Sequence, residues 1–392
     1  ITTTLMQQLE KDEGEMIAIR RHLHQHPELS FQEKATAAYI KAYYEKLDCQ
    51  ITECGDGYGL IVDIIGEQPG KRLALRADFD ALAVEEDNQL PFRSQVPGVM
   101  HACGHDGHTA YLMVLAKNLI TLKDQLKGSI RIIHQPAEEV SPGGAKGMIA
   151  DGCLTDIDHV LGVHMMSSME TGKIGYHSGE TQTGRANFTL TIRGKGGHAS
   201  MPQLANDAIV AGSYFVTQLQ TIVSRRIDPF DTASLTIGSF DGSGSFNAIK
   251  ETVTLKGDVR VMKETTRQTI HQQIQRMADG LAQTFAVETS LEYDDNYPVL
   301  YNDPAFTLQV IDSLKEAHLP EVKEIFDCGP QDPSEDFAYY AQERPSLFFY
   351  IGCMTEDHLN HPHHSPDFMM NEDCLLIAAK AVGTATIAYL MD

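Results

Sequence analysis

Polar residues that can bind metal ions follow several apolar segments of the chain. A strand predicted at 72–77 leads into two aspartates, one at 129–133 leads into two adjacent glutamates, and one at 159–163 ends in a histidine. The loop His-Ala-Cys-Gly-His-Asp-Gly-His lies between the first two, and a His-His pair comes far downstream. Because open α/β sheets place their sites at the carboxyl ends of strands, we expect these side chains to meet. The candidates are Asp78, Cys103, His105, Glu138, Glu139, His164 and His364.

The donor types in this set predict a divalent metal centre. Thiolate, imidazole and carboxylate groups bind late first-row ions when a rigid scaffold brings them together. Cys103 and His105 are one residue apart, whereas Glu139, His164 and His364 come from separate segments. One thiolate, one carboxylate and three imidazoles fit two ions that share a bridging water. A thiolate favours softer ions such as zinc, and manganese, nickel and cobalt are further candidates.

The adjacent pair Glu138 and Glu139 predicts hydrolytic chemistry. Neighbouring carboxylates in an extended turn point in different directions, so one can bind an ion while the other takes a proton from the activated water. Asp78 is then best interpreted as the group that orients a ligand imidazole.

The remaining pattern predicts an α/β fold with an inserted domain. Helices are predicted at 5–24, 31–47 and 108–126, with Ser30 and Glu33 forming a capping box for the second. Apolar strands alternating with helices predict a mixed, mostly parallel sheet with helices on both faces. Between 184 and 295 the order β-α-β-β-α-β predicts a ferredoxin-like α+β satellite domain. Residues 1–183 and 296–392 then form one discontinuous metal-binding catalytic domain.

Composition excludes several classes of partner. The formal net charge is −23, which disfavours nucleic-acid and membrane-surface binding. We expect no transmembrane run and no signal peptide. The seven cysteines form no Cys-x-x-Cys pair, which predicts reduced thiols and a cytoplasmic protein.

The sequence resembles that of a known family. It is similar to the aminoacylase/carboxypeptidase family of dinuclear metallopeptidases, in the branch of hippurate hydrolases, N-acyl-L-amino acid amidohydrolases and indole-acetyl-amino acid hydrolases. The resemblance spans nearly the whole chain. It rests on RRHLHQHPELSFQE (21–34), LRADFDAL (75–82), HACGHDGHTA (101–110), QPAEE (135–139), GVHMMSSMETGKI (162–174), GKGGHASMP (194–202), SEDFAY (334–339) and HHSPDF (363–368).

The resemblance implies roles for individual residues. It implies Cys103, His105, Glu139, His164 and His364 as ligands and Glu138 as general base and acid. His198 would stabilise the oxyanion, entering the partner's site in dimeric relatives, and Asn247 and Arg260 would contact substrate. In one respect the chain departs from the wider family, because Arg76 stands where many relatives have a ligand His.

The predicted function is a metal-dependent amidohydrolase that cleaves N-acyl-L-amino acids, such as hippurate-like or N-acetyl substrates. The satellite domain would act as a lid or dimerisation domain of a homo-oligomer, a dimer or a tetramer. The alternative is a dipeptidase or aminopeptidase with the same chemistry. Two other classes are a cysteine hydrolase built on Cys103 and a non-catalytic metal- or peptide-binding module; the first leaves the glutamate pair without a role, and the second would have lost the base.

Overall fold

The computed structural model describes residues 1–55 and 57–392 and divides the chain into two compact units. Unit 1 comprises Ile1–Gly179, Tyr301–Pro330 and Asp336–Asp392. Unit 2 comprises Glu180–Leu300 and Gln331–Glu335. Unit 2 is thus inserted between two parts of unit 1, and its short second segment lies far along the chain from the first.

The eight-stranded sheet of unit 1 is mixed, as the apolar strand pattern predicted. Its centre, β4-β3-β5-β16, is parallel, whereas β1-β2-β4 and β16-β6 pair antiparallel and β6-β15 is parallel again. The parallel centre brings the carboxyl ends of four strands to one edge. The strands are, in sheet order, β1 (Gln50–Cys54), β2 (Gly59–Ile65), β4 (Lys127–Gln135), β3 (Gln68–Asp78), β5 (His159–Glu170), β16 (Ser346–Met354), β6 (Lys173–Tyr176) and β15 (Glu324–Asp327).

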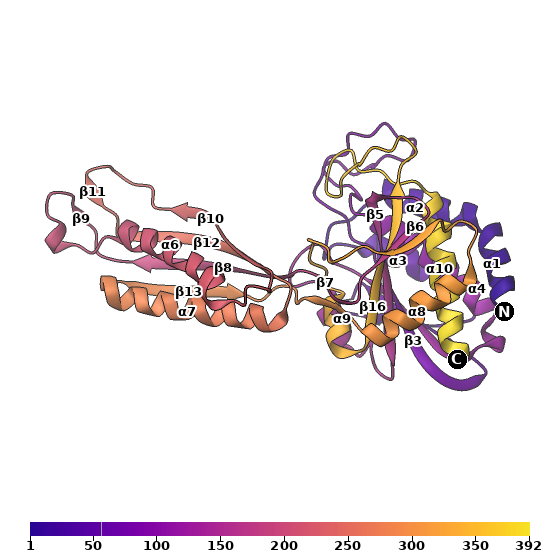
Figure 1. Ribbon diagram of the computed structural model, residues 1–392. Helices are drawn as coiled ribbons and strands as arrows, with labels where there is room; N and C mark the ends of the chain where they lie inside the picture. Colours follow the sequence, from indigo (N-terminus) through magenta and orange to yellow (C-terminus); the bar gives the residue numbers. More distant parts are fainter. Residues whose placement is uncertain (56) are drawn as a thin grey trace. The chain divides into compact units, whose positions relative to one another are not determined.

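Helices cover both faces of this sheet (Figure 1). One face packs against a large apolar core with α4 and α10 at its centre. On the other face, Phe337 lies against Gly162 of β5, and Tyr340 donates a hydrogen bond to Gln135 at 3.1 Å. The helices of unit 1 are α1 (Thr2–Lys11), α2 (Glu13–Gln25), α3 (Lys34–Tyr44), α4 (His105–Thr121), α5 (Ala145–Ala150), α8 (Pro304–Ala317), α9 (Ala338–Glu343) and α10 (Asp373–Met391), with a 3₁₀ turn at Lys123–Gln125.

Helix α10 is long and apolar enough to cross a membrane by length and composition, with a mean hydropathy of 1.7. Of its most apolar window, 89% is buried inside the protein. It packs against α1, α4 and α8, so its apolar character is accounted for by the core of unit 1.

Two details of the predicted helices are wrong. The single helix at 5–24 is two helices that meet at Asp12, and the helix predicted at 31–47 begins only at Lys34. The expected capping box is absent, because Ser30 and Glu33 make no cap bond to this helix. Glu28 takes that role, since its carboxylate accepts hydrogen bonds from the amides of Ala35 and Thr36 at 3.0 and 2.7 Å. Ser30 and Glu33 are therefore free to bond elsewhere.

Unit 2 is a four-stranded antiparallel sheet in the order β10-β12-β8-β13, with two helices packed against it. This is the predicted ferredoxin-like arrangement. Alternate residues of β8 point into the core, as the strand's apolar-polar alternation required. The elements are β8 (Gly184–Arg193), α6 (Ala208–Arg226), β10 (Ala233–Asp241), β12 (Thr252–Val261), α7 (Glu264–Phe285) and β13 (Glu288–Asp294), with the pair β9 (Gly197–His198) and β11 (Ala248–Ile249) and a 3₁₀ turn at Pro202–Leu204. Two short strands, β7 (Gly179–Gln182) and β14 (Leu300–Asn302), lie where the chain passes between the units.

Candidate active site

The metal-ligand candidates of unit 1 lie together at the carboxyl edge of the sheet. His105 Nε2 is 3.6 Å from Glu139 Oε1, and His364 Nε2 is 3.2 Å from Glu139 Oε2. Cys103 Sγ is 3.6 Å from His164 Nε2. The fold therefore brings five donor side chains that are far apart in the sequence close enough together to bind the same ions.

Cys103 is shared by two groups of donors. Its sulfur lies within 4.8 Å of the donor atoms of His105 and His164, and within the same distance of those of Glu139 and His364. Each group offers a thiolate and two further donors, which suits one divalent ion with open positions. The donor set thus fits two ions, and Cys103 would be available as a ligand to either.

The hydrogen bonds of this cluster support its fit to cations. His105 Nε2 and Glu139 Oε1 are buried and have no hydrogen-bond partner among the described residues. Buried polar atoms without partners are costly, and a bound ion is one of the few ways to satisfy them. His105, Glu139 and their neighbours therefore have the donor atoms that a metal centre requires.

The imidazole of His105 is oriented by Asp80. His105 Nδ1 lies 3.0 Å from both the backbone oxygen and the Oδ1 of Asp80, so it carries the proton and leaves Nε2 for an ion. Asp78, the residue that we expected to orient a ligand, contacts His108 Nδ1 at 2.7 Å and Arg76 at 2.9 Å, and its Oδ2 lies 3.6 Å from His105 Nε2. Asp80 was missed, although its two-residue spacing from Asp78 places both on the same side of an extended segment.

His108 lies beside the cluster but is not available as a ligand. Its Nδ1 faces Asp78, and its Nε2 accepts a hydrogen bond from the amide of Met165 at 3.0 Å. With both nitrogens engaged, His108 has a structural role. His164, in contrast, places Nδ1 against the backbone oxygen of Met165 at 2.8 Å and keeps Nε2 for the site.

Glu138 and Glu139 both lie beside His105, and one oxygen of each carboxylate and a nitrogen of His105 lie within 4.8 Å of one another. Glu139 lies between His105 and His364, whereas Glu138 Oε2 is 4.0 Å from His105 Nε2. Glu138 is 5% exposed. A carboxylate thus lies beside the ion positions without being part of either group that contains Cys103.

The electrostatics of Cys103 disfavour a free nucleophilic thiolate. Burial, followed by the charges of Glu139 and Glu138, raises the pKa of the Cys103 thiol well above its usual value. Reactive cysteines need the opposite, a lowered pKa. A cation deprotonates a coordinating thiol outright, so this environment suits a metal ligand better than the nucleophile of a cysteine hydrolase.

Arg76, which the resemblance places where many relatives have a ligand histidine, is a buried structural cation. Its guanidinium donates to Gln135 at 2.9 Å, to Asp78 at 2.9 Å and to Asp336 at 2.7 Å. Burial opposes ionisation of Asp78, but the charges of His105 and Arg76 hold its pKa well below the usual range. Arg76 thus fixes the strand end that carries Asp78 and does not bind metal itself.

The candidate substrate residues of unit 2 fall into two places. His198 and Asn247 are neighbours, since β9 pairs with β11 and the amide of Ala199 donates to the backbone oxygen of Asn247 at 3.1 Å. Arg260 lies near the end of β12, where it pairs with Arg185 at the start of β8. From Thr252 to Arg260, β12 extends roughly 26 Å at a strand rise of about 3.3 Å per residue. Figure 1 shows β9 and β11 at one end of the unit 2 sheet.

The tautomer of His198 suits a hydrogen-bond donor. Its Nδ1 accepts a hydrogen bond from the amide of Ser200 at 3.1 Å and lies 2.7 Å from the Ser200 hydroxyl. A nitrogen that accepts from a backbone amide carries no proton, so Nε2 carries it. The exposed ring can therefore present an N–H group to an anionic oxygen.

The family model of the peptidase family M20/M25/M40 matches residues 74–387. The chain belongs to this family. It is 41% identical over 290 residues to an N-acyl-L-amino acid amidohydrolase of Geobacillus stearothermophilus, covering 74% of this chain and 78% of that protein.

Solved structures agree with this membership. A proposed aminohydrolase from methicillin-resistant Staphylococcus aureus is 55% identical with a TM-score of 0.97, and all of both chains is covered. The Bacillus subtilis protein YXEP, described as a dinuclear metal binding peptidase of the M20 family, is 29% identical with a TM-score of 0.84, covering 97% of this chain and 99% of that one. The chain is thus an M20-family hydrolase with a fold that holds two metal ions in a relative.

A buried ionic network supports the start of α4 in this M20 enzyme. His24 Nδ1 is 2.9 Å from Asp106, and its Nε2 is 3.0 Å from Glu86. Arg20 also contacts Asp106, at 2.9 Å. Asp106 directly follows the ligand candidate His105, so Arg20 and His24 of α2 fix the position of the segment that carries His105.

We expect replacement of His24 by glutamine to destabilise the fold in a pH-dependent way. Burial opposes protonation, but the carboxylates of Asp106 and Glu86 raise the pKa of His24 above its usual value near 6.5. A raised folded-state pKa stabilises the native protein at pH values below the unfolded pKa, and this contribution is lost as pH rises through the folded value. The free energy of unfolding of the variant should be about 3–5 kcal/mol lower than that of the wild type at pH 5.5.

Urea denaturation of the metal-free protein at pH 5.5 and pH 9 measures this effect. The difference in the free energy of unfolding between wild type and His24→Gln should be smaller at pH 9 than at pH 5.5. His26→Gln is the control, because His26 lies exposed at the end of the same helix. An equal loss at both pH values would show that His24 contributes only by packing.

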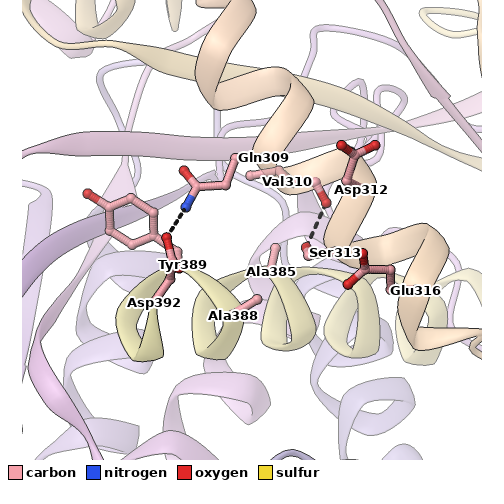
Figure 2. Close-up of a pocket in the computed structure, with 9 residues that line it drawn as sticks. All are labelled: Gln309, Val310, Asp312, Ser313, Glu316, Ala385, Ala388, Tyr389 and Asp392. Atoms are coloured by element: carbon pink, nitrogen blue, oxygen red, sulfur yellow. Dashed lines mark hydrogen bonds between the residues drawn. The ribbon is translucent and has the colours of Figure 1, made fainter.

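A pocket between α8 and α10 is separate from the metal centre (Figure 2). It carries the carboxylates of Asp312, Glu316 and Asp392, and Gln309 donates to Asp392 at 3.3 Å. None of the metal-ligand candidates lines it. The pocket therefore takes no part in the chemistry of the site.

Proposed function

We propose that this protein is an amidohydrolase that cleaves the amide bond of N-acyl-L-amino acids with two divalent ions. The observation that carries the proposal is the shared position of Cys103 between two donor groups, with Glu138 beside them and outside both. The name of the similar Geobacillus protein supports the substrate class. Zinc or manganese is the proposed metal, with nickel or cobalt as alternatives, since the donor set contains a thiolate, a carboxylate and imidazoles.

In the proposed mechanism, Glu138 moves the proton. When bound, the ions would polarise the water and the amide carbonyl, which lowers the cost of the negative charge that develops. Glu138 takes a proton from the attacking water and returns it to the leaving nitrogen. His198 donates its Nε2 proton in a hydrogen bond to the developing oxyanion.

The separation within unit 2 supports a homodimer as the working enzyme. An amino acid with a small acyl group is much shorter than the distance from Arg260 to the β9-β11 pair. One substrate therefore cannot contact Arg260 and His198 of the same copy. We propose that His198 and Asn247 act on the substrate bound by a second copy of the chain.

A surface of unit 2 is suited to this association. Apolar side chains of α6 and the edge strand β10 are exposed together, and an edge strand offers unpaired backbone groups to a partner. The side chains are Ile209, Val210, Tyr214 and Phe240, between 38% and 60% exposed. Light scattering after size-exclusion chromatography should give the mass of a dimer.

Arg260 is the proposed partner of the substrate carboxylate. Asp258 and Ser334 hold its guanidinium at 2.8 and 3.1 Å, so its orientation is fixed before substrate binds. We expect Arg260→Ala to raise KM roughly 10- to 100-fold, with a smaller change in kcat, because a charge-assisted bond of about 1.5–3 kcal/mol is lost. Steady-state kinetics measure this, with Arg276→Ala as control. An N-acyl amino acid amide, which lacks the carboxylate, should show little change, and an equal change would contradict the assignment.

The cytoplasm is the proposed location. All seven cysteines lie in the described part of the chain and none of them forms a disulfide bond, as expected for a reducing compartment.

Assays with a panel of hippurate, N-acetyl amino acids and dipeptides test the function. We expect hydrolysis of the N-acyl amino acids, loss of activity after chelation, and recovery on adding zinc or manganese. Preferred cleavage of dipeptides with a free amine would favour the dipeptidase alternative. Activity that resists chelation and is abolished by alkylation would instead support a cysteine hydrolase.

A further inference from the structure

The backbone just before the two glutamates adopts an unusual conformation. Ala137 has a φ of +54°, in the left-handed region that residues with a side chain rarely occupy. Both polar groups of this residue are bonded. Its amide donates to Glu33 Oε1 at 2.7 Å, and its carbonyl accepts from the amide of Gly144 at 2.9 Å. The turn is therefore held in place by tertiary contacts.

The segment that contains Glu33 also contacts a residue that bonds the backbone of Glu139. The amide of Glu139 donates to Asp80 Oδ2 at 2.9 Å, and the hydroxyl of Ser30 donates to this oxygen at 2.7 Å. Ser30 and Glu33 thus act from one turn of the chain on both ends of Glu138–Glu139. Ser30 works through Asp80, whereas Glu33 bonds the backbone directly.

The side chain of Glu33 has no role in the helix that it precedes. Its side chain makes no cap bond to α3, whose first amides are bonded by Glu28. It is fully buried, and its Oε2 has no hydrogen-bond partner among the described residues. Burial, followed by the charge of Asp80, raises the pKa of Glu33 to about 7. Such a carboxyl group is costly to bury, so a compensating function is expected.

We propose that Glu33 is a positioning residue that directs Glu138 toward the reacting water by holding Ala137 in its left-handed conformation. The proposal rests on the function proposed above for Glu138. Without the bond to Glu33, the turn can relax to an ordinary φ, and the side chain of Glu138 rotates away. Asp80, His105 and His364 still fix Glu139, so metal binding persists.

Two substitutions separate the hydrogen bond from simple packing. Glu33→Met fills the space but cannot accept a bond, whereas Glu33→Gln keeps an acceptor oxygen. We expect Glu33→Met to lower kcat roughly 10- to 100-fold with KM and a content of two ions per chain unchanged. Glu33→Gln should stay within about threefold of wild type. Equal kcat values for the two variants, or loss of the ions from Glu33→Met, would overturn the proposal.

A double-mutant cycle with Ala137→Gly tests the backbone part of the proposal. Glycine adopts a positive φ without the steric cost of a Cβ. Glu33→Met should therefore lower kcat less in the Ala137→Gly background than in the wild type, and strictly multiplicative effects would contradict the mechanism.

Hydrogen exchange of the wild-type protein tests the contact even if Glu33→Met does not fold. The Ala137 amide should be strongly protected, and fast exchange would refute the bond. The two proposals fail differently. A wild-type enzyme that is inactive on every N-acyl amino acid refutes the proposed function, whereas an active wild type with an equally active Glu33→Met refutes only the role of Glu33.

Discussion

Replacing Glu138 by glutamine should reduce kcat by about 10²- to 10⁴-fold, the range expected when a general base and acid is removed. Glutamine has nearly the same shape but cannot take a proton. Since Glu138 lies outside both donor groups that contain Cys103, the protein should retain two ions per chain. Steady-state kinetics combined with elemental analysis of the gel-filtered protein measure both quantities.

Two further glutamate-to-glutamine variants serve as comparisons for Glu138→Gln. Glu139→Gln removes an expected ligand, so it should lose metal together with activity. Glu343→Gln changes an exposed glutamate at the end of α9 and should behave as wild type. Near wild-type turnover in Glu138→Gln, with both ions bound, would show that another group moves the proton.

Replacing Cys103 by alanine should remove both ions and reduce activity by more than about 10³-fold, because the sulfur is the one atom common to the two donor groups. Loss of His164 or His364 alone affects one group each and should leave part of the metal bound. Metal titration of the apo protein by calorimetry, followed by elemental analysis, measures the number of sites and their affinities.

Cys103→Ser is the informative comparison. A hydroxyl is a poorer ligand for soft ions than a thiolate, so the affinity for zinc should fall more than the affinity for manganese. Cys49→Ala is the control, since Cys49 lies just before β1 and its sulfur contacts the backbone oxygens of Tyr44 and Leu47 in its own segment. A Cys103→Ala protein that still binds two ions would refute the shared position of the sulfur.

The residue types and their spacing already indicated which chemistry was available. Metal-binding side chains after successive apolar strands predicted a site at the carboxyl edge of a parallel sheet, because strand direction alone sets that edge. The order of elements in 184–295 likewise predicted the ferredoxin-like fold, since alternation along each strand shows which face is buried. Both predictions depend on local periodicity, which a single sequence records.

How these residues are used depends on contacts that form only in the folded chain. Asp80 lies against Nδ1 of His105 and Asp78 against Nδ1 of His108, and the hydrogen bonds that settle each tautomer come from residues distant in sequence. The spacing of Ser30 and Glu33 matches a local capping box, yet their side chains bond Asp80 and Ala137 instead. Local rules could not predict this, since Glu28 supplied the cap and left both side chains to contacts 50 and 104 residues away.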